Sequence, residues 1–167
     1  MSRDELFALD VDWTHRFVAY TNGHAAHKIA WLLSRTGDSW LWGSLAVLLI
    51  WQVGRLGWVL LITIFAAAGI VALLKGVFKR ARPVTHGREI AQDKYSFPSG
   101  HAARVGAVAV FAIFLRPQWA LLIIMWAVLV SFSRVARSRH YLADVFIGLI
   151  LGILIGISIQ MINLQIG

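Results

Sequence analysis

Two histidines and one aspartate are the residues of this 167-residue sequence best suited to covalent chemistry. His140 and Asp144 are four residues apart, a spacing that places two side chains on one face of a helix within hydrogen-bonding reach. A carboxylate bound to one ring nitrogen fixes the imidazole tautomer and stabilises the imidazolium, so the other nitrogen is free to attack an electrophile. A purely structural hydrogen bond between the two side chains would explain the same spacing.

The second histidine, His101, follows Pro98, Ser99 and Gly100 at a predicted junction between a loop and a helix. Free backbone N–H groups and the helix dipole at such a junction bind anions, and glycine lets a ligand approach the backbone closely. A helix start capped by Ser99 is the simpler explanation of the motif. If the junction does bind an anion, His101 lies in the first helical turn beside it.

Cations accompany both histidine motifs. Lys75 and Arg82 are seven residues apart, or two helical turns, and are expected on one helix face near the end of an apolar segment. Arg134 precedes His140 by six residues, and its guanidinium fork suits phosphate oxygens. Each cation alone is typical of a side chain that reaches from a membrane helix to the headgroups. Together with the two histidines, however, the cations predict a phosphate-transfer site.

Composition places this site at a membrane. The chain is 59% hydrophobic with a mean hydropathy of +0.70, which is too apolar for an ordinary soluble domain. It has no cysteine, which excludes disulfides, thiolate metal ligands and cysteine nucleophiles. The net charge of +8 is carried by residues that interrupt apolar runs. That pattern argues against nucleic-acid binding and favours an anionic lipid surface or a phosphorylated substrate.

The apolar segments predict one all-α domain, residues 1–167, built as an integral-membrane helix bundle with about five transmembrane helices. The predicted spans are residues 39–53, 58–78, 98–115, 119–133 and 142–164. Residues 1–36 form a predicted interfacial segment, and residues 37–167 the catalytic bundle. Within the first, 4–20 is expected to lie in the interface, whereas 27–34 is expected to be interfacial or a short packed helix.

The order of the spans brings the motifs together. Counted along the chain, the loops at 79–97 and 134–141 fall on the same membrane face as the N-terminal segment. Glycines at four-residue spacing on the last span predict a close-packing face at Gly148, Gly152 and Gly156.

The motifs resemble those of the type 2 phosphatidic acid phosphatase family, whose fold is shared with vanadium haloperoxidases. The corresponding segments are residues 75–83, 98–101 and 133–144, with the spacings of the family kept. Residues 98–104 are further similar to the polyisoprenoid diphosphate phosphatases of the family. The resemblance implies hydrolysis of a lipid phosphomonoester or diphosphate without a metal or other cofactor. Candidate substrates are a polyisoprenyl phosphate or diphosphate, phosphatidic acid and phosphatidylglycerol phosphate.

The resemblance also implies a role for each motif residue. His140 would attack phosphorus and form a phosphohistidine, with Asp144 orienting the ring. His101 would protonate the leaving oxygen and then activate water. The phosphate oxygens would be held by Lys75, Arg82, Arg134 and the backbone N–H groups of Ser99 and Gly100.

Further basic residues surround the motifs. Arg104 lies three residues after His101, and we hypothesise that it contacts a second phosphate of a diphosphate substrate. The others are expected to be solvated or to face headgroups, and they are Lys79, Arg80, Arg88, Arg137 and Arg139. Family members commonly have six spans, but the N-terminal region here is too charged for a sixth. Leu142 stands where many members have proline, which should leave the chemistry intact.

The charge distribution and the family resemblance point to opposite membrane faces for the site. Leaving aside Lys75, Arg82 and Arg134, eleven of the sixteen lysines and arginines lie on the motif face, and only Arg55 and Arg116 lie on the other. The positive-inside rule therefore favours a cytoplasmic active site. Many bacterial members of the family instead work on the outer face of the inner membrane. A bacterial inner membrane is expected in either case.

Two other functions fit a basic membrane bundle. A small transporter could use intramembrane cations to bind anions, but it would need ionisable residues near mid-span, where the predicted spans carry almost none. A haloperoxidase-like enzyme would share the anion site, and added vanadate would activate it whereas a phosphatase would be inhibited.

Overall fold

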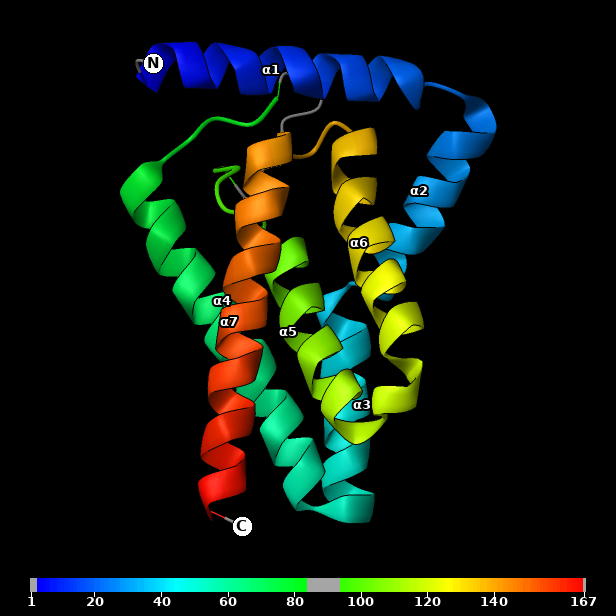
Figure 1. Ribbon diagram of the computed structural model, residues 1–167, viewed down its shortest axis with the longest axis vertical. Coiled ribbons are helices and arrows are strands. Elements are labelled where there is room, and N and C mark those ends of the chain that lie inside the picture. The colour runs from blue at the N-terminus through cyan, green and yellow to red at the C-terminus, as the bar shows by residue number, and fades with distance from the viewer. Residues whose placement is uncertain (1–2, 84–93, 167) are drawn as a thin grey trace.

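Helix α1 (Arg3–Tyr20) lies across one end of a bundle formed by the remaining helices (Figure 1). The computed structural model describes residues 3–83 and 94–166, and these residues contain no β-strand beyond one isolated bridge between Ala81 and Tyr95. The other elements are α2 (His24–Thr36), α3 (Ser39–Val53), α4 (Arg55–Phe78), α5 (Gly100–Leu115), the short 3-10 helix η1 (Pro117–Trp119), α6 (Ala120–Ala136) and α7 (Leu142–Ile166). The predicted all-α fold is confirmed.

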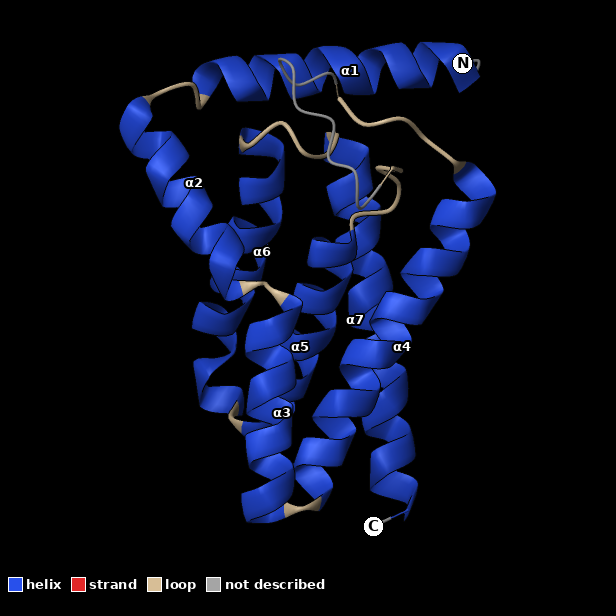
Figure 2. Ribbon diagram, turned by 180° about the vertical axis from the view of Figure 1, so that it is seen from behind, coloured by secondary structure: helices blue, strands red, loops and turns tan. Residues whose placement is uncertain are grey.

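Helices α2 and α3 together run from the α1 end of the bundle to the opposite end (Figures 1 and 2). The helix is interrupted between them at residues 37–38, and α2 packs against α6. The segment 27–34 is therefore a packed helix and does not lie in the plane of α1. Of the predicted interfacial segment, only α1 lies flat across the bundle, because α2 packs against α6, where its buried Ser34 binds Arg134.

In the described part of the chain, three helices are long and apolar enough to cross a membrane alone: Arg55–Phe78, Pro117–Ala136 and Leu142–Gln165. Helix α5 has 16 residues and measures about 24 Å at 1.5 Å per residue, less than the roughly 30 Å hydrocarbon core. With α2–α3 counted as one passage, the described chain runs along the bundle five times, although the predicted first span, 39–53, covers only the α3 half of that passage. Both histidine motifs therefore fall at the α1 end. The compartment that this end faces stays a prediction.

Helix α5 begins deeper in the bundle than the neighbouring ends of α4, α6 and α7 (Figures 1 and 2). Its first helical residue is Gly100, two residues later than predicted, because Ser99 is the N-cap with extended backbone. The chain before α5 is fixed to the segment after α4 by Ser96, whose backbone N–H donates a hydrogen bond of 2.8 Å to the carbonyl of Arg80. Because α5 begins deep in the bundle, the residues at its start lie below the α1 end of the bundle.

Close packing of α7 on α5 confirms the predicted glycine face. A Cβ atom added at Gly152 would overlap the carbonyl of Ala103, and one at Gly156 would lie 2.8 Å from Cβ of Val110. At Gly148 it would lie 2.6 Å from the carbonyl oxygen of Ser99. Only glycine lets the two backbones approach this closely, so this contact fixes the start of α5 against the start of α7.

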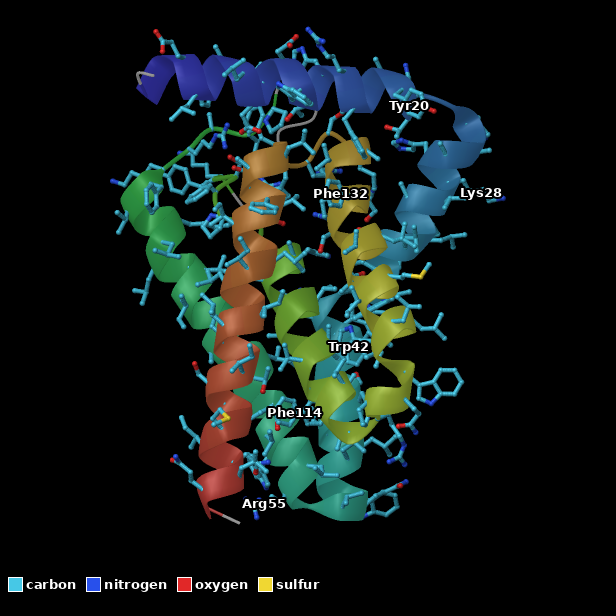
Figure 3. The ribbon with its side chains drawn as sticks, viewed as in Figure 1. Tyr20, Lys28, Trp42, Arg55, Phe114 and Phe132 are labelled. Carbon is cyan, nitrogen blue, oxygen red and sulfur yellow. The ribbon has the colours of Figure 1, made fainter. Side chains whose placement is uncertain are left out.

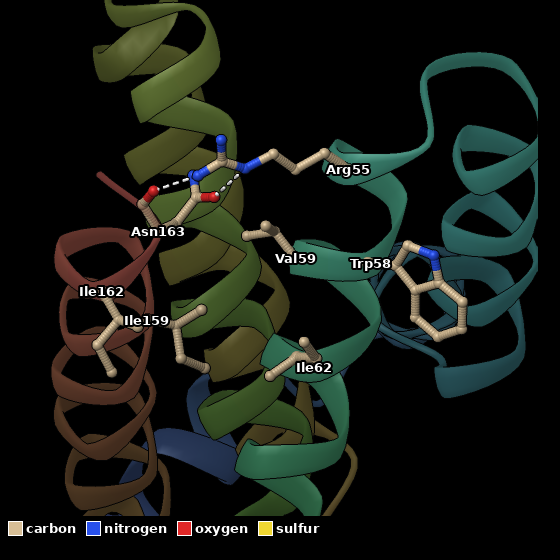
Figure 4. Close-up of a pocket in the computed structure, with 7 residues that line it drawn as sticks. All are labelled: Arg55, Trp58, Val59, Ile62, Ile159, Ile162 and Asn163. Atoms are coloured by element: carbon tan, nitrogen blue, oxygen red, sulfur yellow. Dashed lines mark hydrogen bonds between the residues drawn. The ribbon is translucent and has the colours of Figure 1, made fainter. Parts of the chain in front are cut away.

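Large apolar side chains on the outer faces of α4, α6 and α7 are exposed, as expected for helices that face lipid. The end opposite α1 carries Arg55 (Figure 3), which donates hydrogen bonds to the side chain and the carbonyl of Asn163. These residues border a groove of about 270 Å³ between α4 and α7, lined further by Trp58, Val59 and Ile62 (Figure 4). The groove belongs to this outer apolar surface and lies far from the histidine motifs.

Candidate active site

His140 lies in the turn before α7 and not on the helix. The expectation that His140 and Asp144 stack on one helix face is therefore wrong in detail, because α7 begins only at Leu142. The two side chains still face each other, with 3.6 Å between Nδ1 of His140 and Oδ2 of Asp144. That distance is longer than a hydrogen bond, and Nδ1 has no hydrogen-bond partner among the described residues.

Asp144 is fully buried and holds the turn that carries His140. Its Oδ2 accepts a hydrogen bond of 2.9 Å from the backbone N–H of Tyr141, so an acidic side chain in the first turn reaches back to the residue before the helix. Its Oδ1 pairs with Nη1 of Arg80 at 2.8 Å. The carboxylate therefore fixes the backbone next to His140 as well as facing its ring.

The environment of His140 keeps its imidazole neutral. The side chain is 2% exposed, and this burial lowers the pKa of His140 to about 4. Asp144 opposes the shift, whereas the nearby cations Arg82 and Arg134 add to it. Near neutral pH the ring thus carries a free lone pair, and because Nδ1 faces Asp144, Nε2 is the nitrogen available for attack.

The start of α5 provides fewer anion-binding groups than predicted. The N–H of Ser99 donates to the carbonyl of Asp144 at 2.9 Å, and its hydroxyl accepts from the N–H of Ala102 at 3.4 Å. Ser99 is thus a helix cap and a link to α7, and its N–H is not free. The N–H groups of Gly100 and His101, the first two of the helix, have no intrahelical acceptor and point out of its N-terminus. These two groups are the remaining candidates for the predicted anion nest.

His101 has a carboxylate partner that sequence inspection missed. Its Nε2 lies 2.9 Å from Oδ1 of Asp38, in the break between α2 and α3. The break packs tightly, since a Cβ atom at Gly37 would lie 2.8 Å from Val130 and 3.4 Å from Cδ2 of His101. Both histidines therefore face a carboxylate, and the pair at His101 is the shorter. The only sequence signal was the Gly37-Asp38 helix break.

Arg134 points into the site from the last turn of α6. Its Nη1 donates to the hydroxyl of Ser34 at 2.7 Å, and Arg137 donates to the same oxygen at 3.1 Å. Ser34, on α2, is buried and positions both guanidinium groups. The Nε atoms of Arg134 and Arg137 are buried with no hydrogen-bond partner among the described residues.

Lys75 and Arg82 do not share a helix face. Helix α4 ends at Phe78 because Lys79 adopts a left-handed conformation with φ 46°, and Arg82 lies beyond it. Nη1 of Arg82 donates to the carbonyl of Arg139 at 3.0 Å, which places it beside the turn of His140. Lys75 lies one turn after Val71, whose Cγ1 would be 3.5 Å from a Cβ atom at Gly100. Lys75 therefore occupies the α4 face that leads to the nest.

Arg104 also faces the site. Its Nη1 donates to the carbonyl of Gly37 at 3.0 Å, next to the Asp38–His101 pair, and its Nε is buried without a partner among the described residues. The location next to His101 agrees with the predicted helix side.

Arg80 is the clearest correction among the basic residues expected to be solvated. Its side chain is only 15% exposed and is bound to Asp144 and to Asp10 of α1. Lys79 is exposed as expected, and Arg88 lies outside the described residues. Arg137 is only partly exposed, because of its bond to Ser34.

The site thus combines several half-buried guanidinium groups, two backbone N–H groups and two histidines. Buried donors without acceptors are rare in proteins, and those in the described part of the chain include the Nε atoms of Arg104, Arg134 and Arg137. An anion with several oxygen atoms would satisfy them. The arrangement can hold a phosphoryl group between a neutral His140 and the Asp38-paired His101.

The sequence profile of the PAP2 superfamily matches residues 56–165, which include both histidine motifs. The chain belongs to this superfamily. This result confirms the resemblance to the type 2 phosphatidic acid phosphatases.

Several curated PAP2 relatives carry phosphatase names. An undecaprenyl-diphosphatase of Sulfolobus acidocaldarius is 36% identical over 128 residues, covering 72% of this chain and 62% of the relative. A lipid A 1-phosphatase of Rhizobium johnstonii is 33% identical over 60% of this chain and 45% of the relative. A probable lipid phosphate phosphatase beta of Arabidopsis thaliana is 31% identical over 50% and 54%. The chain thus spans about half to two thirds of the length of these relatives.

Two solved PAP2 structures share the fold. The transmembrane phosphatidylglycerolphosphate phosphatase of Bacillus subtilis superposes with a TM-score of 0.84 at 22% identity, over 98% of this chain and 88% of the other. Aquifex aeolicus LpxE superposes with a TM-score of 0.79 at 20% identity, over 92% and 95%. These likenesses establish the PAP2 helix bundle, and with the apolar helices they identify an integral membrane protein.

Proposed function

We propose that this PAP2 protein is a membrane lipid phosphatase that works through a phosphohistidine on His140. The observation that carries the proposal is the placement of two histidines, each facing a carboxylate, among guanidinium groups whose Nε atoms are buried without partners among the described residues. Neutral His140 supplies a nucleophile, and the cations stabilise the charge that spreads over the phosphoryl oxygens in the transition state.

The first half of the reaction transfers the phosphoryl group to the protein. Nε2 of His140 attacks phosphorus, the bond from phosphorus to the lipid oxygen breaks, and His101 donates a proton to that oxygen. The imidazole becomes positively charged, which strengthens its attraction to Asp144 across the 3.6 Å gap. Catalytic contacts that are long in a free enzyme commonly shorten in this way.

The second half regenerates the enzyme. His101, now without its proton, takes one from a water molecule, and the water oxygen attacks phosphorus while the bond to His140 breaks. Asp38 accepts a hydrogen bond from His101 and stabilises the charged form of this ring, which is present before the first step and again after the second. Lys75, Arg82 and Arg134 with the N–H groups of Gly100 and His101 hold the phosphoryl oxygens.

The substrate class follows from what the relatives share. Their names refer to undecaprenyl diphosphate, lipid A and phosphatidylglycerolphosphate, which have a phosphate group on a lipid in common. The exposed apolar faces of α4 and α7 leave room for acyl or prenyl chains in the bilayer. The recessed start of α5 would draw the headgroup below the membrane surface.

Hydrolysis without a metal ion is the direct test. Full-length protein in detergent is expected to release phosphate from phosphatidic acid, phosphatidylglycerol phosphate or a polyisoprenyl diphosphate equally well with and without EDTA, because the cations of the chain do the work of a metal ion. Orthovanadate should inhibit. Loss of activity in EDTA, or vanadate-dependent bromide oxidation in place of inhibition, would contradict the proposal.

Arg104 is expected to favour diphosphate substrates. Its unpartnered Nε beside His101 could bind the phosphate of the leaving group. Arg104→Gln should lower kcat/KM for a polyisoprenyl diphosphate by about tenfold or more, in line with one lost charged hydrogen bond, and leave the monophosphate within about threefold. Equal losses for both substrates would show that Arg104 supports only the Gly37 turn.

A further inference from the structure

Helix α1 contacts the start of α7 through a pair of polar side chains. Asp10 and Thr14 are four residues apart and share one face of α1. Oδ1 of Asp10 accepts a hydrogen bond of 3.0 Å from the N–H of Ala143, and Oγ1 of Thr14 accepts one of 3.1 Å from the N–H of Leu142. Both N–H groups belong to the first turn of α7 and have no acceptor within their own helix. Helix α1 therefore caps α7 from outside.

Arg80 links this cap to the active-site carboxylate. Its Nη2 lies 2.6 Å from Oδ2 of Asp10, and its Nη1 lies 2.8 Å from Oδ1 of Asp144. The guanidinium stacks against two rings, with its carbon 4.2 Å from the centroid of Tyr141 and 4.8 Å from that of Phe7 on α1. One arginine thus joins α1, the turn of His140 and the first turn of α7.

We propose that Asp10, Thr14 and Arg80 form a clip that positions Asp144 and His140 for attack on the substrate. The inference rests on the proposed phosphatase function but assigns to α1 a role beyond contact with the membrane surface. Asp144 lies in the first turn of α7, so a shift of that turn changes its 3.6 Å separation from His140. The three clip residues are positioning residues, since none of them is placed to touch the phosphoryl group.

The clip also sets the charge around His140. Among the described residues, the charged groups that act on this ring are Asp144 on α7, Arg134 on α6 and Arg82 in the adjoining loop, and Arg80 and Asp10 lie behind Asp144. Arg80 is bound directly to the buried carboxylate of Asp144. Without Arg80, the uncompensated negative charge of Asp144 would favour protonation of His140 more strongly.

Matched variants of the full chain in detergent test the clip. Asp10→Asn and Arg80→Gln are expected to lower kcat by roughly 10- to 100-fold, the usual cost of misplaced reacting groups, with KM changed by less than about threefold. The acid limb of the kcat profile, which follows protonation of His140, should lie near pH 4 in the wild type and move to higher pH in Arg80→Gln. Sensitivity to orthovanadate should fall with kcat, whereas inhibition by inorganic phosphate should persist.

Two controls carry the same charge changes outside the clip. Asp12 pairs with Arg16 on the exposed side of α1, and Lys79 is an exposed neighbour of Arg80. Asp12→Asn and Lys79→Gln should stay within about twofold of the wild type. If the clip variants match these controls, or if KM rises as steeply as kcat falls, the clip is refuted.

A second measurement separates the clip from the proposed activity. Hydrogen exchange over residues 139–146 should accelerate in Thr14→Val, which removes the acceptor of the Leu142 N–H, and should remain slow in Thr14→Ser. A wild type that releases no phosphate would overturn the proposed function while leaving this measurement valid. Exchange in Thr14→Val and Asp10→Asn equal to that of the wild type would overturn the clip.

Discussion

Replacing His140 by glutamine is expected to lower the rate of phosphate release by at least about 1000-fold, because the reaction loses its nucleophile. Glutamine keeps a polar side chain of similar length, so the buried site should retain its packing. The proposed reaction requires only the neutral imidazole of His140. Burial keeps this ring neutral by lowering its pKa to about 4. Phosphate release from a lipid phosphate, followed over single and multiple turnovers, measures the loss.

Labelling that is quenched with denaturing detergent at alkaline pH distinguishes a nucleophilic role of His140 from a structural one. Wild type incubated with a labelled phosphate substrate should yield protein-bound phosphate that is stable in alkali and labile in acid, as expected for a phosphohistidine. His140→Gln should yield none. A matched histidine is available on α1, where His15 is exposed, and His15→Gln should label normally. Persistent labelling of His140→Gln would assign the covalent intermediate to another residue.

Replacing His101 by asparagine is expected to lower kcat for a lipid phosphate by about 10²- to 10⁴-fold, the range for loss of a general acid and base. Transfer of the phosphoryl group to His140 should depend on the leaving group, whereas hydrolysis of the phosphohistidine by water should not. With p-nitrophenyl phosphate, whose leaving oxygen needs no proton, the first step should proceed, but the water step still needs a base. The variant should therefore accumulate the phosphohistidine in a burst of up to one equivalent.

Asp38→Asn should give a smaller loss of the same kind. The 2.9 Å contact with His101 is a hydrogen bond to a group that becomes charged, worth about 1.5–3 kcal/mol, or roughly 10- to 100-fold in rate. Asp12→Asn serves as the control, since that carboxylate pairs on the exposed side of α1. An Asp38→Asn variant as active as this control would mean that the pair orients the α2–α3 break and not the catalytic imidazole.

The sequence alone was sufficient to predict the family and the membrane helix bundle, and it named the candidate catalytic residues. These features are encoded locally. Apolar segments of sufficient length predict helices whatever their partners, and His101, His140 and Asp144 stand in motifs whose spacing is itself the signal. The glycines at 148, 152 and 156 likewise predict close packing, although they do not say that α5 is the partner.

Only the tertiary structure revealed the supporting residues. Asp38 and His101 are 63 positions apart, and Arg80 is 70 positions from Asp10. A single carboxylate between two helices, or an arginine at a membrane end, has the same local appearance whether it is solvated or buried in an ion pair. Which of these occurs depends on the fold: α5 is short enough to begin inside the bundle, and α1 lies over the start of α7.

The folded chain also decided which backbone groups remain available to a phosphate. Ser99 occupies the motif position predicted to contribute an N–H group, yet that group is taken by the carbonyl of Asp144. The left-handed turn at Lys79 likewise separates Arg82 from the helix of Lys75. Residue types and spacings determine the available chemistry. Hydrogen bonds between distant segments determine which donors and charges are free to perform it, because most buried polar groups bind a neighbour in space.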